Sequence, residues 1–393
     1  MPTKILIVDD EPDLQLMITQ KFRKQVRENE MQFVFSTGGV DALKKLQEEG
    51  DVDVVLTDIN MPEMDGLTLI AKLNERYPLL KAVIVSAYGD MANIRTALNL
   101  GAFDFVTKPI DFHDLEITLY KSIREASSMK QAAKDRDQLV TLQHELEVAR
   151  RIQKSIVPRT FPPFPARQDF QIYADMIPAQ EVGGDFYDFF LIDQERLGFV
   201  IGDVSGKGIP AALFMAVSKT LLKATALKGL PPGECLEQVN RILYMESVAA
   251  MFVTIFYGIL NTRHGEVEYS NGGHNPPYIL RGNGKVESTE IGGGLVLSAL
   301  ENSRYKTNRF VLQPGDGLFL FTDGVTEAMN TEQNEFTATR LIESLKRQTG
   351  ADLTGLVNGV INDVRVFSTD APQADDITIL SLRYGGRAHS AEG

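Results

Sequence analysis

The sequence predicts two domains of different fold class, a doubly wound α/β domain at the N-terminus and a layered α+β domain at the C-terminus. Short apolar runs alternate with helix-like stretches over residues 1–122. A long charged stretch without glycine or proline follows, and β-rich runs without a βαβ repeat fill the rest. The length of 393 residues also exceeds that of one ordinary hydrophobic core.

The bulk composition, 43% hydrophobic and 24% charged, is ordinary for a soluble globular protein. A net charge of -13 disfavours binding to nucleic acid. Cys235 is the one cysteine, which excludes an intramolecular disulfide and favours a reducing compartment. No apolar run approaches the roughly 18–20 residues of a membrane span, and the start of the chain leaves no room for a signal peptide. We therefore expect a cytoplasmic protein without a membrane or nucleic acid partner.

Apolar, β-branched runs in residues 1–122 predict a parallel sheet covered by helices on both faces. They are Ile5 to Val8, Phe33 to Phe35, Val52 to Leu56, Ala82 to Val85 and Phe103 to Val106. In a doubly wound domain the active groups lie at the carboxyl ends of the strands. Functional residues are therefore expected just after these runs.

Residues 123–158 predict a helical linker. Apolar side chains there alternate at spacings of three and four, with Gln153 in one polar slot; they are Leu139, Leu142, Leu146, Ala149 and Ile156. This a/d pattern is typical of a coiled coil, which would make the protein a homodimer through the linker. A single amphipathic helix packed on its own domain is the alternative.

A proline-rich break separates the linker from residues 159–385, where β-rich runs and helical stretches interleave. Without a βαβ repeat, this pattern predicts an α+β domain, a β-sandwich flanked by helices. The expected helices lie near residues 210–227, 233–247, 338–348 and 353–366. Residues 386–393 predict a disordered tail.

Polar side chains follow the first, third, fourth and fifth apolar runs of the N-terminal domain: Asp9, Asp10, Asp58, Ser86 and Lys108. In a parallel sheet these strand ends meet at one edge. Three carboxylates at one edge repel one another, so the site needs a hard cation such as Mg²⁺. An aspartate beside Mg²⁺, a lysine and a hydroxyl is suited to accept a phosphoryl group.

These residues resemble the response-regulator receiver family, which implies a flavodoxin-like fold, a two-component pathway and an upstream histidine kinase. By this resemblance Asp58 is the phosphoacceptor, Ser86 the switch hydroxyl and Lys108 the phosphate-binding lysine. The implied magnesium ligands are Asp9, Asp10, Asp58 and the carbonyl group of Asn60. Phe105 stands where many members carry a tyrosine switch, so the ring is kept without its hydroxyl.

Aspartates also punctuate the C-terminal domain, each at the border of an apolar run and a glycine or turn: Asp185, Asp203, Asp323, Asp375 and Asp376. Widely separated aspartates with glycine neighbours suit two hard cations, Mg²⁺ or Mn²⁺ rather than zinc. Such a pair can activate a water molecule for displacement at phosphorus without a covalent nucleophile.

Residues 145–385 resemble the PPM (protein phosphatase 2C-like) family, in its SpoIIE/RsbU-like branch. The motifs that carry this are the aspartates above, Ala149 to Pro158 and Ser270 to Pro277. The resemblance implies a metal-dependent serine/threonine phosphatase. Its implied substrate is a phosphorylated STAS-type anti-sigma-factor antagonist in a partner-switching pathway. The alternative is a non-catalytic adaptor that binds a sigma factor or anti-sigma factor through a decayed phosphatase fold.

The same resemblance implies a role for each aspartate of the C-terminal domain. Asp203 bridges both metals and the Val204 carbonyl group joins one of them. Asp323 and Asp375 bind the other, and Asp185 completes the acidic pocket. Asp376 could replace Asp375 as a ligand, and the sequence leaves this choice open.

Two further features were weighed against catalysis. Cys235 and Arg241 have the spacing of cysteine phosphatases, but the stretch between them has no glycine and reads as helix. A structural cysteine is the better interpretation. His274 could be a general acid or bind phosphate, although a Gly-Gly-His-Asn-Pro-Pro turn is more often structural.

Overall fold

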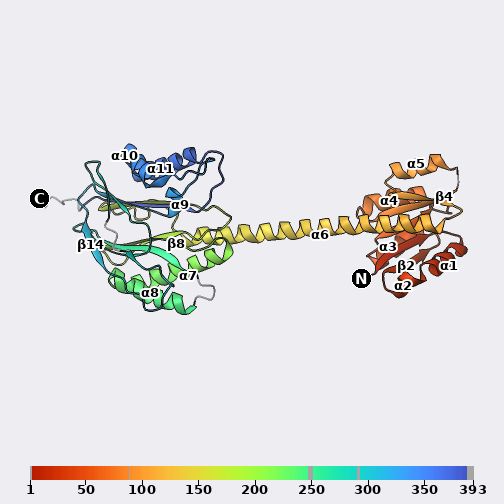
Figure 1. Cartoon of the computed structure of the whole chain (residues 1–393), viewed down its shortest axis with the longest axis horizontal. Helices are drawn as coiled ribbons and strands as arrows, with labels where there is room; N and C mark the ends of the chain where they lie inside the picture. Colours follow the sequence, from red (N-terminus) through yellow and green to blue (C-terminus); the bar gives the residue numbers. More distant parts are fainter. Residues whose placement is uncertain (1, 88, 247–250, 290–292, 387–393) are drawn as a thin grey trace. The chain divides into compact units, whose positions relative to one another are not determined.

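The computed structural model describes residues 2–87, 89–246, 251–289 and 293–386 (Figure 1). Apart from Gly386, the predicted disordered tail lies outside the described residues. The chain divides into two units, Met1–Leu142 and Gln143–Gly393, each with its own core. The predicted domain bounds at residues 122 and 158 remain predictions.

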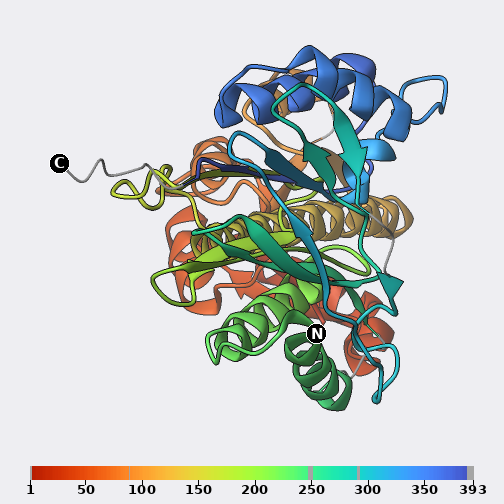
Figure 2. The ribbon, with the colours of Figure 1, turned by 90° about the vertical axis from the view of Figure 1, so that its left-hand side faces the viewer.

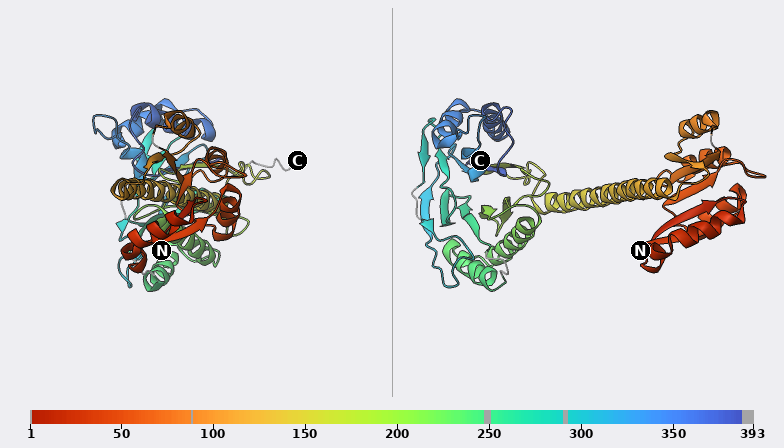
Figure 3. Two further views of the ribbon diagram at one scale, coloured as in Figure 1. Left: turned by 90° about the vertical axis from the view of Figure 1, so that its right-hand side faces the viewer. Right: turned by 45° about the vertical axis from the view of Figure 1, so that its right-hand side comes forward.

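The N-terminal unit contains one parallel sheet in the strand order β2-β1-β3-β4-β5 (Figure 3, red to orange). Its strands are β1 (Thr3–Val8), β2 (Met31–Ser36), β3 (Val54–Asp58), β4 (Lys81–Ala87) and β5 (Asp104–Lys108). The order reverses at β1, as in doubly wound folds. The predicted α/β class is confirmed.

Helices cover both faces of this sheet, because successive strand residues point to opposite sides. They are α1 (Pro12–Lys21), α2 (Arg23–Arg27), α3 (Gly39–Glu49), α4 (Gly66–Arg76) and α5 (Met91–Asn99). Ile5 and Ile7 share a core with α1, whereas Leu6 and Val8 share the other core with α3, α4 and α5. Burial on both sides explains why the strands read as unbroken apolar runs.

The linker is one helix, α6 (Phe112–Ile156), so a long helical linker is confirmed. Its first turns belong to the N-terminal unit, where Leu115 and Leu119 are fully buried. Leu139 and Leu142, which belong to the predicted seam, are 60% and 49% exposed in the single chain. The coiled coil and the homodimer therefore stay predictions.

The C-terminal unit contains two sheets, in the orders β13-β10-β9-β8-β7 and β12-β11-β15-β16-β6, with β14 beside β10. Neighbouring strands are antiparallel except for the pair β10 and β13. The strands are β6 (Phe170–Ile177), β7 (Phe186–Leu191), β8 (Arg196–Val204), β9 (Val253–Asn261), β10 (Glu266–Gly272), β11 (Tyr278–Leu280), β12 (Val286–Ser288), β13 (Gly293–Gly294), β14 (Asn308–Val311), β15 (Gly317–Phe321) and β16 (Ile377–Tyr384).

Helices flank the two sheets on their outer faces (Figure 2). They are α7 (Ile209–Ala226), α8 (Pro232–Glu246), α9 (Asp323–Thr326), α10 (Thr337–Arg347) and α11 (Leu353–Phe367). Along β15, Leu318 and Leu320 belong to the main core with the first sheet, whereas Phe319 and Phe321 pack with α10 and α11. The predicted sandwich flanked by helices is confirmed.

Helix α7 is long and apolar enough to cross a membrane by length and composition alone, although the sequence suggested no such stretch. Its packing gives another reason for its apolar character. Met215 and Leu222 are fully buried in the core of the C-terminal unit. Lys219 of α7 lies 2.6 Å from Asp188 of β7, and both side chains are buried. A single helix of this kind is weak support for a membrane span, since core helices pass the same test.

Candidate functional site

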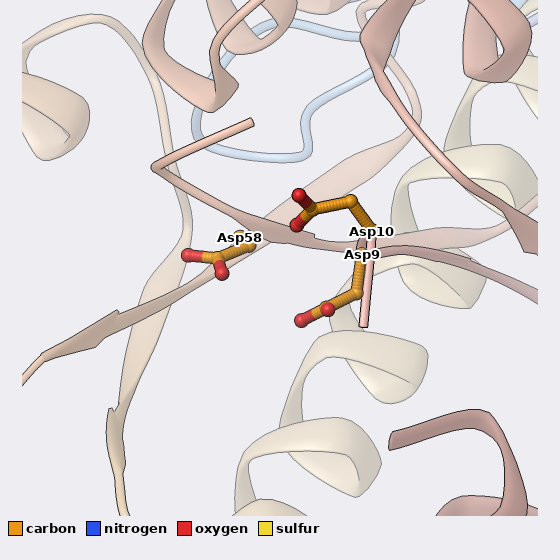
Figure 4. A group of neighbouring side chains, drawn as sticks. All are labelled: Asp9, Asp10 and Asp58. Atoms are coloured by element: carbon orange, nitrogen blue, oxygen red, sulfur yellow. The ribbon is translucent and has the colours of Figure 1, made fainter. Parts of the chain in front are cut away.

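The first acidic site lies at the carboxyl end of the receiver-like sheet. Oxygen atoms of Asp9, Asp10 and Asp58 lie within 4.8 Å of one another (Figure 4), and Asp9 and Asp58 are buried. Asp58 ends β3, and Asp9 and Asp10 directly follow β1, which pairs with β3. Carboxylate oxygens at this spacing are the ligands that Mg²⁺ prefers.

Lys108, the last residue of β5, closes this site. Its Nζ atom lies 2.6 Å from Oδ2 of Asp58 and 3.4 Å from Oδ2 of Asp9. Burial lowers the pKa of Lys108, but the hydrogen bond and charge of Asp58 outweigh it and leave this pKa raised. Burial also raises the pKa of Asp9. The lysine thus supplies a fixed positive charge beside the predicted phosphoacceptor.

The other predicted receiver residues are Asn60, which follows β3, Ser86 in β4 and Phe105 in β5. The backbone N–H of Asn60 donates to Oδ1 of Asp58 at 3.3 Å. Ser86 is buried in β4, one residue beyond the partner of Asp58 in the β3–β4 register. Phe105 is half-buried in β5 and lines a shallow cavity with residues of α5. The structure therefore places Asn60 beside Asp58, and Ser86 on the neighbouring strand, where its hydroxyl lies 3.5 Å from Oδ2 of Asp90. Phe105 lies on the face toward α5.

The second acidic site lies where the two sheets of the C-terminal unit meet. Asp185 directly precedes β7, and Asp203 lies near the end of β8, its antiparallel partner. Asp323 follows β15 as the first residue of α9, and Asp375 and Asp376 directly precede β16, the partner of β15. Because adjacent antiparallel strands end and begin at the same edge, each sheet presents its aspartates at one edge.

Hydrogen bonds across the sheets bring these edges together. The Thr322 hydroxyl donates to Oδ2 of Asp185 at 2.7 Å. The backbone N–H groups of Ala179 and Gly184 both donate to the carboxylate of Asp376 at 2.8 Å. Asp185 itself is 1% exposed. The loop before β7 is therefore fastened to the start of β16.

Burial and mutual repulsion raise the pKa values of the aspartates in this site. Burial, with the charges of Asp203 and Asp376, raises the pKa of Asp185 well above its ordinary value. Burial and the Asp323 charge raise the pKa of Asp203 to about 7. Burial and the Asp375 charge also raise the pKa of Asp323. Such a cluster of oxygen donors fits hard divalent cations, which would remove the repulsion.

Asp375 and Asp376 have different surroundings, and this bears on the choice that the sequence left open. Both carboxylate oxygens of Asp376 accept backbone hydrogen bonds, and its side chain is buried. Asp375 is partly exposed and its charge acts on Asp203 and Asp323. Lys207 Nζ lies 3.1 Å from its Oδ2. Oδ1 of Asp375 in turn accepts from the Asp376 N–H at 2.9 Å, and the charge of Asp376 acts on Asp185 and Asp203. Both aspartates therefore belong to the acidic site, and the choice of metal ligand between them stays open.

The Val204 carbonyl group, a predicted metal ligand, faces the loop before Asp185. A Cβ atom at Gly184 would lie 2.7 Å from this oxygen. Glycine at this position therefore lets the backbone approach the end of β8 closely.

In metal-free protein, the raised pKa of Asp203 predicts that stability falls as pH rises. An unfolded aspartate ionises near pH 4, whereas folded Asp203 does so at about 7. Between these values the folded state holds more protons, so the free energy of unfolding decreases with pH, by about 1.4 kcal/mol for each unit of pKa difference. Denaturant titrations in chelator at pH 5 and pH 7.5 should show this loss. Asp203→Asn should flatten the dependence, and an equal slope in both proteins would contradict the assignment.

The surroundings of Cys235 and His274 favour structural roles over catalytic ones. Cys235 is buried in α8, and burial raises the pKa of its thiol to about 12, which disfavours a thiolate nucleophile. His274 is buried, and its Nδ1 atom lies 2.8 Å from the Thr254 hydroxyl. Burial lowers the pKa of His274 to about 4, so the ring is neutral near pH 7 and holds no proton to donate as an imidazolium acid.

Sequence reasoning assigned no role to Thr322, Lys207 or Gln153, although all three contact this site or its loop. The sequence contained a clue to Thr322, which stands directly before Asp323 at the end of a strand. It also contained a clue to Gln153, which is a polar residue in an otherwise apolar seam. It contained no clue to the contact of Lys207, because the partner Asp375 is remote in the chain.

Together these features define a class of protein. The N-terminal unit is a receiver fold with its acidic pocket, and the C-terminal unit is a two-sheet phosphatase fold of the PP2C type with an aspartate cluster between the sheets. Residues 5–120 match the response regulator receiver domain family, and residues 193–385 match the family of stage II sporulation protein E (SpoIIE). The chain therefore joins a receiver domain to a SpoIIE-family, PP2C-like phosphatase domain.

Relatives agree with this assignment. Protein IcfG of Synechocystis sp. is 31% identical over 268 residues, which cover 61% of this chain and 41% of IcfG. Phosphoserine phosphatase RsbU of Bacillus subtilis is 28% identical over 272 residues, which cover 69% of this chain and 79% of RsbU. The solved SiaA-PP2C domain of Pseudomonas aeruginosa, at 22% identity, covers 63% of this chain and 98% of that domain with a TM-score of 0.54, which shows the fold. The chain thus spans less than half the length of IcfG.

Proposed function

We propose that this protein is a two-component response regulator in which phosphorylation of Asp58 controls a metal-dependent phosphoserine/phosphothreonine protein phosphatase. The observation that carries the proposal is the group of Asp185, Asp203 and Asp323, whose raised pKa values reflect burial and mutual repulsion. A decayed site would have lost one or more of these carboxylates. The likeness to RsbU, named a phosphoserine phosphatase, supports the same activity.

In the phosphatase site, Asp203 would bridge two cations. The Val204 carbonyl group would join one of them, Asp323 and Asp375 would hold the other, and Asp185 completes the pocket. Two Mn²⁺ or Mg²⁺ ions bound there would supply an activated water molecule and neutralise the phosphoryl oxygens. Asp376 acts through the backbone of the loop before Asp185, and the Thr322 hydroxyl orients the Asp185 carboxylate.

In the receiver domain, Asp58 would attack the phosphorus atom of the phosphodonor and displace the donor's leaving group. Lys108, whose Nζ atom lies 2.6 Å from Oδ2 of Asp58, would bind the phosphoryl oxygens. Asp9, Asp10 and the Asn60 carbonyl group, with Asp58, would hold Mg²⁺, and Ser86 is the switch hydroxyl. A receiver domain implies a kinase partner, and we propose a histidine kinase. The Phe105 ring lies beside α5. We propose that its position changes when Asp58 is phosphorylated and thereby alters the surface at α5.

The proposed substrate is the phosphoserine or phosphothreonine form of a small STAS-type anti-sigma-factor antagonist. The likeness to RsbU, whose name gives a phosphoserine phosphatase, supports the phosphoserine part of this proposal. We further propose that the protein is cytoplasmic and forms a homodimer through α6, whose exposed Leu139 and Leu142 need a partner surface.

The direct test is phosphatase activity of the full chain on a phosphorylated STAS protein encoded nearby, with Mn²⁺ and with or without acetyl phosphate. We expect release of inorganic phosphate that depends on the cation, and a rate that acetyl phosphate changes severalfold. Asp58→Asn should turn over at a rate that acetyl phosphate does not alter. Binding of the STAS protein or its anti-sigma factor without any hydrolysis, in the presence of Mn²⁺, would favour the adaptor alternative.

A further inference from the structure

The end of the linker helix contacts the phosphatase site through one buried side chain. Gln153 of α6 donates from Nε2 to the Gly183 carbonyl oxygen at 2.6 Å. The Gly183 N–H donates to Oε1 of the same side chain at 3.2 Å. Gln153 is only 4% exposed. One carboxamide therefore satisfies both backbone groups of a single residue, two positions before Asp185.

Gly183 is held equally closely on its other side. A Cβ atom there would lie 2.0 Å from Oδ2 of Asp376, the oxygen that accepts from the Gly184 N–H. The loop is thus confined between α6 and the start of β16, with no room for a side chain. A displacement of Gly183 must move Asp185, because the Asp185 N–H also points at this carboxylate oxygen, 3.4 Å away.

The chemistry of this contact suits an amide side chain. A carboxamide carries an uncharged donor and an uncharged acceptor side by side on one carbon, so it can pair with the C=O and the N–H of the same residue. An apolar residue would leave two buried backbone groups unpaired, which is costly. One turn earlier Arg150 pairs with Glu181 at 3.3 Å, but both side chains are largely exposed, so this pair contributes little. After the helix, the Tyr187 hydroxyl donates to the Pro158 carbonyl group at 2.6 Å and fastens the chain to β7.

We propose that Gln153 is a positioning residue through which the linker helix sets the loop before Asp185, and thereby the cation affinity of the phosphatase site. The inference rests on the proposed function, which gives the site its cations and the receiver its control. Helix α6 runs unbroken from the core residues Leu115 and Leu119 to Ile156. A rotation or shift imposed on it reaches Gln153, because the helix is hydrogen-bonded throughout.

The test compares Gln153→Met, Gln153→Glu and the control Gln143→Met in the full chain. Methionine keeps the length without hydrogen bonds, glutamate keeps the acceptor without the donor, and Gln143 is exposed on the same helix. Mn²⁺ binding by titration calorimetry should weaken about tenfold or more in Gln153→Met and less in Gln153→Glu, and stay unchanged in Gln143→Met. With p-nitrophenyl phosphate, Gln153→Met should need more Mn²⁺ for half-maximal rate, reach nearly the same rate at saturation, and lose its response to acetyl phosphate.

The outcomes separate this inference from the proposed function. If Gln153→Met binds Mn²⁺ as the wild type does, or keeps the full response to acetyl phosphate, the positioning role is wrong. A wild type without turnover, beside a Gln153→Met variant with weakened Mn²⁺ binding, overturns the phosphatase and leaves the positioning role standing. Loss of cooperative unfolding in both Gln153 variants would assign the residue to fold stability and also overturn the inference.

Discussion

Replacement of Asp203 by asparagine should abolish phosphatase activity while leaving the fold intact. This carboxylate lies between Asp185 and Asp323, and its pKa of about 7 shows how strongly the site disfavours another uncompensated charge. Asparagine keeps the shape but loses the charge that would hold two cations together. Because bound metal supplies several kcal/mol of transition-state stabilisation, we expect the rate to fall on the order of 10³-fold or more.

The measurement is the rate of phosphate release from a phosphoserine substrate at saturating Mn²⁺, together with calorimetric Mn²⁺ binding. Asp370→Asn is the matched control, because Asp370 is exposed and has a positive φ of 66° that asparagine tolerates. Circular dichroism and thermal unfolding of metal-free protein check the fold, and the Asp203 variant should be at least as stable as the wild type above neutral pH. Retention of a tenth or more of the wild-type rate would contradict the bridging role.

Replacement of Asp58 by asparagine should eliminate phosphorylation of the receiver. Asp58 is the carboxylate that Lys108 contacts most closely, and it shares a cluster with Asp9 and Asp10. An amide oxygen is not a nucleophile toward phosphorus under these conditions, so the loss should be complete rather than partial. The wild type, incubated with acetyl phosphate and Mg²⁺, should gain a base-labile acyl phosphate that mass spectrometry of the intact chain detects.

Asp13→Asn provides the control, since Asp13 is an exposed carboxylate in the first turn of α1. It should label as the wild type does. Base-labile phosphate at the wild-type level on the Asp58 variant would show that another residue is the acceptor and would refute the assignment.

The receiver site could be predicted largely from local sequence patterns. Asp9, Asp10, Asp58 and Lys108 were predicted as one site because parallel strands place their carboxyl ends at one edge. The structure gathers these four side chains there. The rule works without knowledge of packing, since the apolar runs by themselves identify the strands and their direction.

The strands of the phosphatase unit were harder to predict from local sequence patterns. Strand β7 (Phe186–Leu191) escaped prediction because its apolar run is interrupted by Asp188. That aspartate is buried and pairs with Lys219 of α7, which is 31 residues away. In the sequence, a charged residue is normally expected at the surface, because its distant partner cannot be recognised. Here Asp188 lies in the interface between α7 and β7.

By itself the sequence determined the two fold classes, the helical linker and the aspartates of both acidic sites, because strand periodicity and glycine-flanked carboxylates are local features. The tertiary structure alone decided which partners those aspartates have. Asp376 accepts from the N–H of Gly184, 192 residues away, whereas Asp375 pairs with Lys207 at 3.1 Å. It also gave Gln153 its partner, Gly183, 30 residues along the chain. Such contacts depend on how sheets and helix pack together, and packing is a property of the whole fold rather than of any segment.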